Sequence, residues 1–210
     1  TFLYASARNI STRKAAENEI KLLNAGLEKL ALTDFLTNLF NRRYFMQRGT
    51  EAVNRVMRTQ EPLALLMLDV DLFKRINDNY GHEVGDLAIQ HVAAVLKSSL
   101  REIDFLARIG GEEFAVLLPN TDQAEAAVLA ERIRKLMQDT LFEAAGAAIT
   151  ITISLGVAGF EEGMVDIDTL LRNADLALYA AKHRGRNCVV IFQDNLLLPR
   201  SPEGEASGMA

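Results

Sequence analysis

The chain has a single cysteine, Cys188, among its 210 residues. One thiol can form neither an internal disulfide nor a multi-thiolate metal site, so secreted disulfide scaffolds and zinc fingers are excluded. This cysteine content fits a reducing compartment, and we expect a cytoplasmic chain, or the cytoplasmic part of a larger or membrane-anchored protein.

Positive charge is not in excess, because 23 Lys and Arg face 28 Asp and Glu, a formal net charge of −5. A nucleic-acid backbone would meet a net negative surface, so we expect no nucleic-acid polymer as a partner. The longest uncharged stretch, 144–160, alternates isoleucines with Thr150, Thr152 and Ser154. This period of two is typical of a strand and not of a membrane helix.

A hydrophobic content of 49% provides for a sizeable core. The length predicts one domain plus an appendage. We place the domain at 32–194, an N-terminal signalling helix at 1–31 and a disordered tail at 195–210. The chain begins at Thr1 without a signal-peptide pattern. We therefore expect a fragment with an upstream sensor domain or regulatory protein.

The N-terminal segment carries apolar residues on one helical seam: Ala16, Ile20, Leu23, Leu27 and Leu30. This spacing favours a parallel dimeric stalk for signalling, although it covers only about two heptads. The alternative is a helix that packs against its own domain.

The remaining periodicities predict an order of helices and strands. Helices are expected at 42–58, 71–79, 84–100, 122–140 and 166–184, and strands at 63–68, 105–109, 113–118, 149–158 and 188–192. Thr33 and Asp34 offer cap chemistry, Leu87 is expected among the buried residues of the third helix, and Gly110 and Gly111 offer positive φ for a hairpin. The order predicts an α+β, ferredoxin-like fold with helices on a largely antiparallel five-stranded sheet.

Acidic side chains follow two strands of this predicted sheet. Asp69 ends an apolar strand, and Glu112 and Glu113 lie at the tip of the glycine hairpin. Converging carboxylates suit Mg²⁺ in phosphoryl or nucleotidyl transfer, and glycines let a triphosphate approach the backbone. Each of these residues also has a plainer interpretation when it is considered alone. Asp69 would be a solvated strand end, the two glycines would form a turn, and Asp71 would be a helix N-cap.

Four separated segments of the chain carry further information: DVDLFKRINDNYGHEVGD at 69–86, RIGGEEF at 108–114, TDFLTNLFNRR at 33–43 and AKHRGRN at 181–187. Together they resemble the GGDEF family of diguanylate cyclases over about residues 32–192. The resemblance implies a nucleotidyl-cyclase palm that condenses two GTP into cyclic di-GMP and releases two pyrophosphates. It also implies a homodimer, because one half-site holds only one GTP. Mild departures are Asn38 for glycine, Ile109 for an aromatic and Glu112 for aspartate.

The resemblance implies a metal and catalytic set. Asp69, the Val70 carbonyl and Glu112 would hold Mg²⁺, or Mn²⁺ in its place, with two ions in each half-site. Glu113 would accept the 3′-hydroxyl proton or steer the attacking group. Arg108 would support Glu113 by pairing with it, or make a plain cross-strand contact.

The resemblance also implies a substrate-binding set. The phosphates would be bound by the backbone N–H groups of Leu72, Phe73 and Lys74, the Gly110-Gly111 backbone, and the side chains of Lys182 and Arg186. Asn77 and Asp86 would read guanine, since a carboxylate accepts its N1–H and N2–H₂ together. The plainer interpretation makes Lys182 and Arg186 a solvated helix end, Asp86 a cap and Asn77 a turn former.

An inhibitory product site is implied by Arg101 and Asp104, an RxxD arrangement, together with Arg132. An exposed Arg and Asp three residues apart is otherwise a routine surface pair. Two further functions remain open: a non-catalytic receptor for cyclic di-GMP or GTP, and a related nucleotidyl cyclase with another product. We assign no catalysis to His91, His183 or Cys188.

Overall fold

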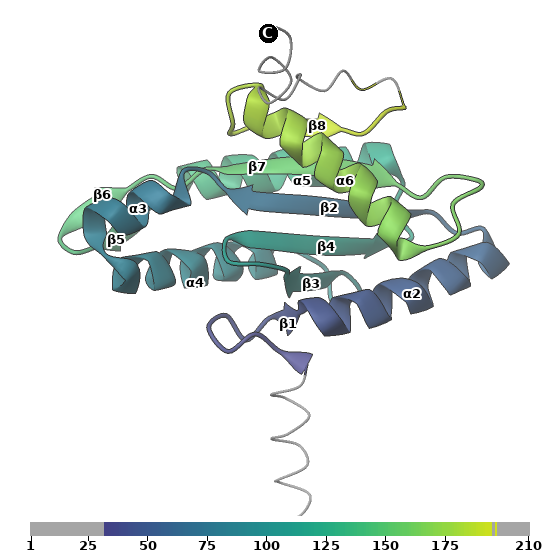
Figure 1. Ribbon diagram of the computed structural model, residues 1–210, viewed down its shortest axis with the longest axis horizontal. Helices are drawn as coiled ribbons and strands as arrows, with labels where there is room; N and C mark the ends of the chain where they lie inside the picture. The colour runs from purple at the N-terminus through teal and green to yellow at the C-terminus, as the bar shows by residue number, and fades with distance from the viewer. Residues whose placement is uncertain (1–31, 195, 197–210) are drawn as a thin grey trace, which may run out of the picture.

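The structure is a computed structural model that describes residues 32–194 and residue 196 (Figure 1). The predicted stalk at 1–31, and the predicted tail apart from residue 196, lie outside the described residues. Among the described residues, no helix is both long and apolar enough to cross a membrane.

One six-stranded sheet forms the centre of the domain, in the order β1-β3-β4-β2-β7-β8. Its strands are β1 (Phe40–Asn41), β2 (Leu63–Val70), β3 (Phe105–Arg108), β4 (Glu113–Pro119), β7 (Ile153–Gly159) and β8 (Val189–Ile191). The inner pairs β3-β4, β4-β2 and β2-β7 are antiparallel, and the outer strands β1 and β8 run parallel to their neighbours. The expected α+β class is confirmed, with β1 as a sixth strand at the edge.

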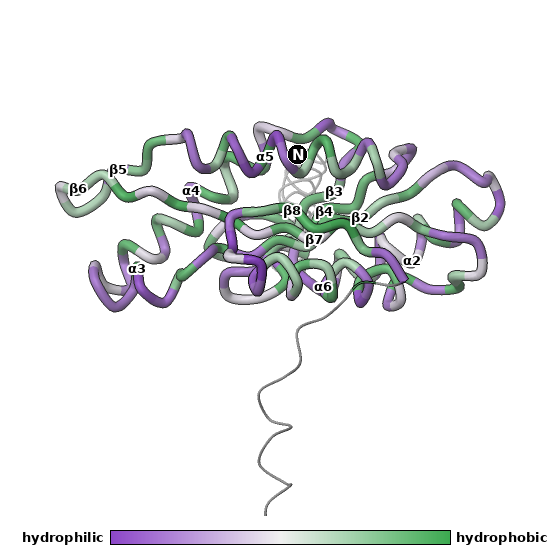
Figure 2. The backbone as a smooth tube through the Cα atoms, turned by 90° about the horizontal axis from the view of Figure 1, so that it is seen from above, coloured by the Kyte–Doolittle hydropathy of each residue, from purple (hydrophilic) through white to green (hydrophobic). Residues whose placement is uncertain are grey.

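Helices cover both faces of the sheet (Figures 1 and 2). The helices are α2 (Arg42–Thr59), α3 (Phe73–Tyr80), α4 (His82–Ser99), α5 (Gln123–Asp139) and α6 (Ile167–His183). Residues of α4 and α5 share one buried cluster with alternate residues of the sheet, and residues of α2 and α6 share the other. The domain is therefore a layered sandwich of helices, sheet and helices.

The central strand β2 shows why two helical layers are needed. All eight of its residues are buried. Leu66 and Leu68 join the cluster under α4 and α5, whereas Leu65 and Met67 join the cluster under α2 and α6. An uninterrupted apolar run of this kind is stable only when both faces of its sheet are covered.

Three local expectations were wrong. The strand expected at 149–158 is divided into β6 (Ala147–Ile149), which pairs with β5 (Phe142–Ala144) in a separate hairpin, and β7. Leu87 is 50% exposed, because it lies on the outer face of α4. The side chain of Asn41, instead of Thr33 or Asp34, caps α2 by accepting the Tyr44 N–H.

Candidate active site

The structure brings the predicted carboxylates of β2 and β4 together. Asp69 is directly opposite Glu113 in the antiparallel register, and the Val70 N–H donates to the Glu112 carbonyl at 3.2 Å. Side chains alternate along a strand, so Asp69 shares the α6 face of the sheet with Met67, and Glu113 shares it with Ala115. Two neighbouring strands therefore present acidic groups at one place.

Asp69 is a buried carboxylate under competing influences. Only 7% of the residue is exposed, and its Oδ2 lies 2.7 Å from the Nζ of Lys182 on α6. Burial raises the pKa of Asp69 to about 6; Lys182 opposes this rise, while the negative charges of Glu112 and Glu113 add to it. The local field thus favours a further cation.

This donor set fits a magnesium ion that completes its coordination with substrate oxygens. Asp69 and Glu112 offer carboxylates and Val70 a backbone carbonyl. No group of three or more His, Cys, Asp and Glu side chains forms a metal cluster in the described part of the chain. Mg²⁺ commonly takes one or two carboxylates together with phosphate and water, so phosphates and water would complete the shell here.

The chain leaves β2 through a strained residue. Leu72 has φ 54° and ψ 30°, and it precedes α3 without a side-chain cap. The first N–H groups of α3, which include those predicted to bind phosphate at Phe73 and Lys74, thus have no side-chain cap from Leu72. Leu72 has the N-cap position, so α3 begins later than the expected Asp71.

Asp71 is not the helix N-cap that the sequence predicts. It is buried, and its carboxylate accepts hydrogen bonds from Thr152 Oγ1 at 2.8 Å, Ser154 Oγ at 2.6 Å and the Asn187 N–H at 2.9 Å. These partners could not be predicted from the sequence, because they lie more than 80 positions further along the chain. No short motif relates Asp71 to them.

The expected phosphate-binding cations lie at the end of α6. Lys182 lies in its last turn, and Arg186 follows in an exposed segment with φ 65°. Lys182 contacts Asp69 directly. The structure therefore joins the closing sequence segment to the carboxylate end of β2.

The expected guanine-reading pair lies at the corner between α3 and α4. Asp86 is exposed on α4, and Asn77 Oδ1 is buried without a hydrogen-bond partner within the described range. A Cβ placed on Gly85 would lie only 1.8 Å from this Oδ1. Gly85 is therefore glycine because the Asn77 amide occupies the space beside it.

The predicted pair between Arg108 and Glu113 does not form, because the Arg108 guanidinium binds other partners. Nη1 lies 3.0 Å from Asp34 Oδ1, and Nε and Nη2 donate to the Gly111 carbonyl at 3.0 and 2.6 Å. Burial raises the pKa of Asp34, but hydrogen bonds from Thr37 and Arg108 outweigh this and hold it below its usual range. Arg108 thus ties the turn before β1 to the glycine hairpin.

The three residues expected at an inhibitory site line one pocket of about 420 Å³. Asp104 Oδ2 accepts the Arg101 N–H at 2.8 Å, and Arg132 Nη2 donates to the Ser99 carbonyl at 2.9 Å. Asp104 Oδ1 is buried without a hydrogen-bond partner among the residues described. This pocket therefore holds basic groups beside an unused acceptor.

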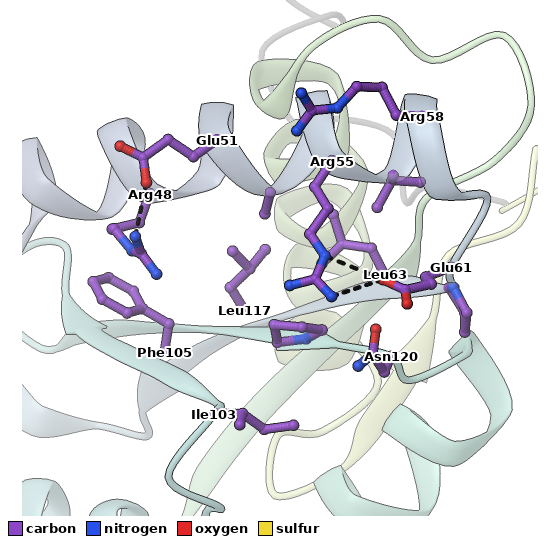
Figure 3. A pocket seen from close by; sticks show the side chains of 14 residues that line it. Arg48, Glu51, Arg55, Arg58, Glu61, Leu63, Ile103, Phe105, Leu117 and Asn120 are labelled. Atoms are coloured by element: carbon purple, nitrogen blue, oxygen red, sulfur yellow. Dashed lines mark hydrogen bonds and ion pairs between the residues drawn. The ribbon is translucent and has the colours of Figure 1, made fainter.

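A second pocket, of about 280 Å³, was not anticipated from the sequence (Figure 3). It lies between α2 and the β3 edge of the sheet, and Arg48, Arg55 and Arg58 line it. Arg48 pairs with Glu51 at 2.7 Å and lies over the ring of Phe105. Arginines three and seven positions apart fall on one helical face, and that spacing is the only sequence signal for this pocket.

A family model and the curated relatives of this chain indicate the same protein family. The family model described as diguanylate cyclase, GGDEF domain, matches residues 31–188. Diguanylate cyclase A of Treponema denticola is 38% identical over 192 residues, which cover 90% of this chain and 52% of that protein. Response regulator PleD of Caulobacter vibrioides is 41% identical, covering 77% of this chain and 36% of its own length. The chain thus spans about half or less of these curated relatives.

Solved structures agree with this relationship. The coiled coil and GGDEF domain of DgcB from Caulobacter crescentus, in complex with c-di-GMP, superposes with a TM-score of 0.82 at 31% identity, covering 87% of this chain and 97% of that chain. The active GGEEF domain of a Vibrio cholerae diguanylate cyclase gives 0.70 at 35% identity, covering 74% and 98%. The facing carboxylates of β2 and β4, the glycine hairpin and these matches lead to one conclusion. The chain belongs to the GGDEF-domain family of diguanylate cyclases.

Proposed function

We propose that this chain is a diguanylate cyclase domain, which condenses two GTP into cyclic di-GMP with release of two pyrophosphates. The observation that carries the proposal is the placement of Asp69 directly opposite Glu113 on neighbouring strands, with Lys182 Nζ 2.7 Å from Asp69 Oδ2 and the negative charge of Glu112 close enough to act on Asp69. The names of the curated relatives support the same reaction.

Each protein group has a defined part in this reaction. The 3′-oxygen of one GTP attacks the α-phosphorus of the other, the bond to the bridging oxygen breaks, and pyrophosphate leaves. Asp69, Glu112 and the Val70 carbonyl would hold the divalent cation, which supplies charge neutralisation and lowers the pKa of the 3′-hydroxyl. Glu113 would accept the hydroxyl proton, and Lys182 and Arg186 would bind the departing phosphates.

Lys182 exchanges partners in this scheme. Without substrate, it neutralises the buried Asp69 carboxylate. With nucleotide and a divalent cation bound, Asp69 would hold the cation, and the Lys182 ammonium group would leave Asp69 and bind the phosphate tail. Asn77 and Asp86 would then select guanine over adenine, because adenine lacks the paired donors that a carboxylate accepts.

The active form would be a homodimer with Mg²⁺ or Mn²⁺ in each half-site. One domain holds one GTP, so two domains must face each other to bring the 3′-hydroxyl to the partner's α-phosphate. Alignment of two bound reactants accelerates reaction strongly. An N-terminal helix that sets the two domains in register would therefore control the rate.

Product inhibition would act at the pocket of Arg101, Asp104 and Arg132. Arginine forks suit phosphates and guanine edges, and Asp104 Oδ1 is an unused acceptor for a guanine donor. A solved relative of this chain contains c-di-GMP. Arg101→Ala should weaken inhibition by added cyclic di-GMP while leaving the initial rate close to wild type.

A product analysis tests the proposed activity. The purified protein is incubated with GTP and Mg²⁺, and the products are identified by mass, beside Glu113→Gln and the exposed control Glu162→Gln. We expect cyclic di-GMP from the wild type and the control, and none or little from Glu113→Gln. Tight cyclic di-GMP binding without turnover would instead assign a receptor, and a different mass would assign another nucleotidyl cyclase.

A further inference from the structure

The segment after α6 has an unusual backbone. Gly185, Arg186 and Asn187 are consecutive residues with φ values of 109°, 65° and 44°. The left-handed region is open to glycine and tolerated by asparagine, but it strains the backbone of an arginine. Such a conformation persists only where the surroundings hold it, and strain of this kind is concentrated at functional sites.

Three residues from two parts of the fold hold Asn187. Its N–H donates to Asp71 Oδ2 at 2.9 Å, at the end of β2. Its side-chain Oδ1 accepts from Arg134 on α5 at 2.8 Å, and its Nδ2 donates to Gln138 on the same helix at 3.0 Å. Arg134 is itself fixed by Glu131 at 2.8 Å. The position of Asn187 is therefore determined by contacts with β2 and α5.

Asp71 is a rigid anchor for this arrangement. It is buried, and Thr152 and Ser154 at the start of β7 donate to its two oxygens. The segment from Lys182 to Asn187 is thus attached to the end of β2 twice, by Lys182 to Asp69 and by Asn187 to Asp71. In the proposed reaction Lys182 releases Asp69, so the Asp71–Asn187 bond is the attachment that remains.

We propose that Asp71 and Asn187 are positioning residues for Arg186, holding its strained backbone so that the guanidinium meets the phosphate tail of the bound nucleotide. This inference rests on the proposed function for its ligand, a nucleoside triphosphate. Arg134 gives outer support from α5. Neither Asp71 nor Asn187 needs to touch substrate for this role.

A double-mutant cycle between residues 186 and 187 tests the proposal. Asn187→Gly keeps the left-handed backbone accessible and removes only the side-chain bonds to Arg134 and Gln138. Arg186→Ala and Asn187→Gly should each lower kcat/KM for GTP by about tenfold or more. The double variant should resemble Arg186→Ala alone, because Asn187 acts through Arg186. Asn187→Asp, which keeps the acceptor for Arg134, should recover most of the loss.

Binding and folding are measured beside turnover. Affinity for a non-hydrolysable GTP analogue with Mg²⁺ should follow the same non-additive pattern, and thermal unfolding confirms that each variant is folded. Additive losses in the double variant, or no loss from Asn187→Gly, would overturn the positioning role of the Asn187 side chain, since this variant keeps the backbone N–H bond to Asp71. If the wild type makes no cyclic di-GMP but the binding cycle is non-additive, the proposed function fails and the positioning role stands.

Discussion

At the scale of single residues, the ionised form of Asp69 is only partly stabilised by its surroundings, and its pKa is therefore raised. It is buried beside Glu112 and Glu113, and Lys182 is its cation partner. A charged group in this position lowers the stability of the empty domain, because burial and like charges disfavour it. The same imbalance would favour the divalent cation of the proposed function, because a further positive charge would stabilise the Asp69 carboxylate.

This imbalance predicts a pH-dependent effect of Asp69→Asn in EDTA. The folded pKa is raised from 3.8 to about 6, so between these values the folded chain holds a proton that the unfolded chain releases. The free energy of unfolding of the wild type therefore falls as pH rises through this window. Asp69→Asn should match the wild type below the window and exceed it above pH 6, by on the order of 1–3 kcal/mol.

Urea denaturation across this pH range measures the difference. Asp78→Asn, at an exposed position of α3, is the matched control and should show no such pH-dependent gain. An Asp69→Asn domain that is less stable than wild type at pH 7.5 would contradict the prediction.

The two glycines of the hairpin should respond differently to alanine. A Cβ on Gly110 would lie 2.6 Å from Glu113 Oε2, whereas a Cβ on Gly111 meets nothing within 4 Å. Neither has positive φ, contrary to the sequence expectation. Gly110→Ala should therefore displace the Glu113 carboxylate and lower kcat, with little change in thermal stability. Gly111→Ala should mainly raise KM, by obstructing nucleotide; the reverse assignment in steady-state kinetics would refute this account.

At the scale of elements, Arg108 connects the turn before β1 with the β3-β4 hairpin. Its pair with Asp34 leaves only 12% of the Arg108 side chain and 16% of the Asp34 side chain exposed. The turn is also attached to α4, since Gln90 donates to the Leu36 carbonyl at 3.1 Å. A movement of this turn would therefore be transmitted to the Gly111 carbonyl by the Arg108 side chain, which contacts both.

Removal of this pair should destabilise the domain and disturb the hairpin. We expect Asp34→Ala to lower the free energy of unfolding by about 1–3 kcal/mol, because a partly buried guanidinium loses its charged partner. Glu51→Ala is the control, since its pair with Arg48 is half exposed and should contribute at most about 1 kcal/mol. Equal losses for the two variants in chemical denaturation would contradict this expectation.

At the scale of the whole molecule, the proposed reaction needs two domains. Leu23 and Leu27 lie on the predicted seam outside the described residues. Changing both to glutamate should produce a monomer that binds a GTP analogue like the wild type and makes cyclic di-GMP far more slowly. Sedimentation with parallel activity assays measures both properties. Undiminished turnover in a monomeric double variant would remove the dimer from the proposal.

Much of this protein follows from its sequence alone. The apolar run of β2 and the helical periods predict the five helices and the inner strand β2 to within a few residues, because these signals are local. The sequence also predicts which residues would carry the chemistry, because Asp69, Glu112 and Glu113 are adjacent to strand ends and glycines. The placement of Asp69 opposite Glu113 needs only the antiparallel pairing of β2 with β4.

The tertiary structure alone decided how these groups are held. Asp71 is buried and accepts hydrogen bonds from β7 instead of capping a helix. Arg108 pairs with Asp34 and not with Glu113. Gly110 leaves space for the Glu113 carboxylate and does not have positive φ. The first two outcomes depend on partners that the fold brings together from distant parts of the chain. A carboxylate or guanidinium has several sterically possible partners nearby in sequence, and only the packed fold determines which one burial and hydrogen bonding favour.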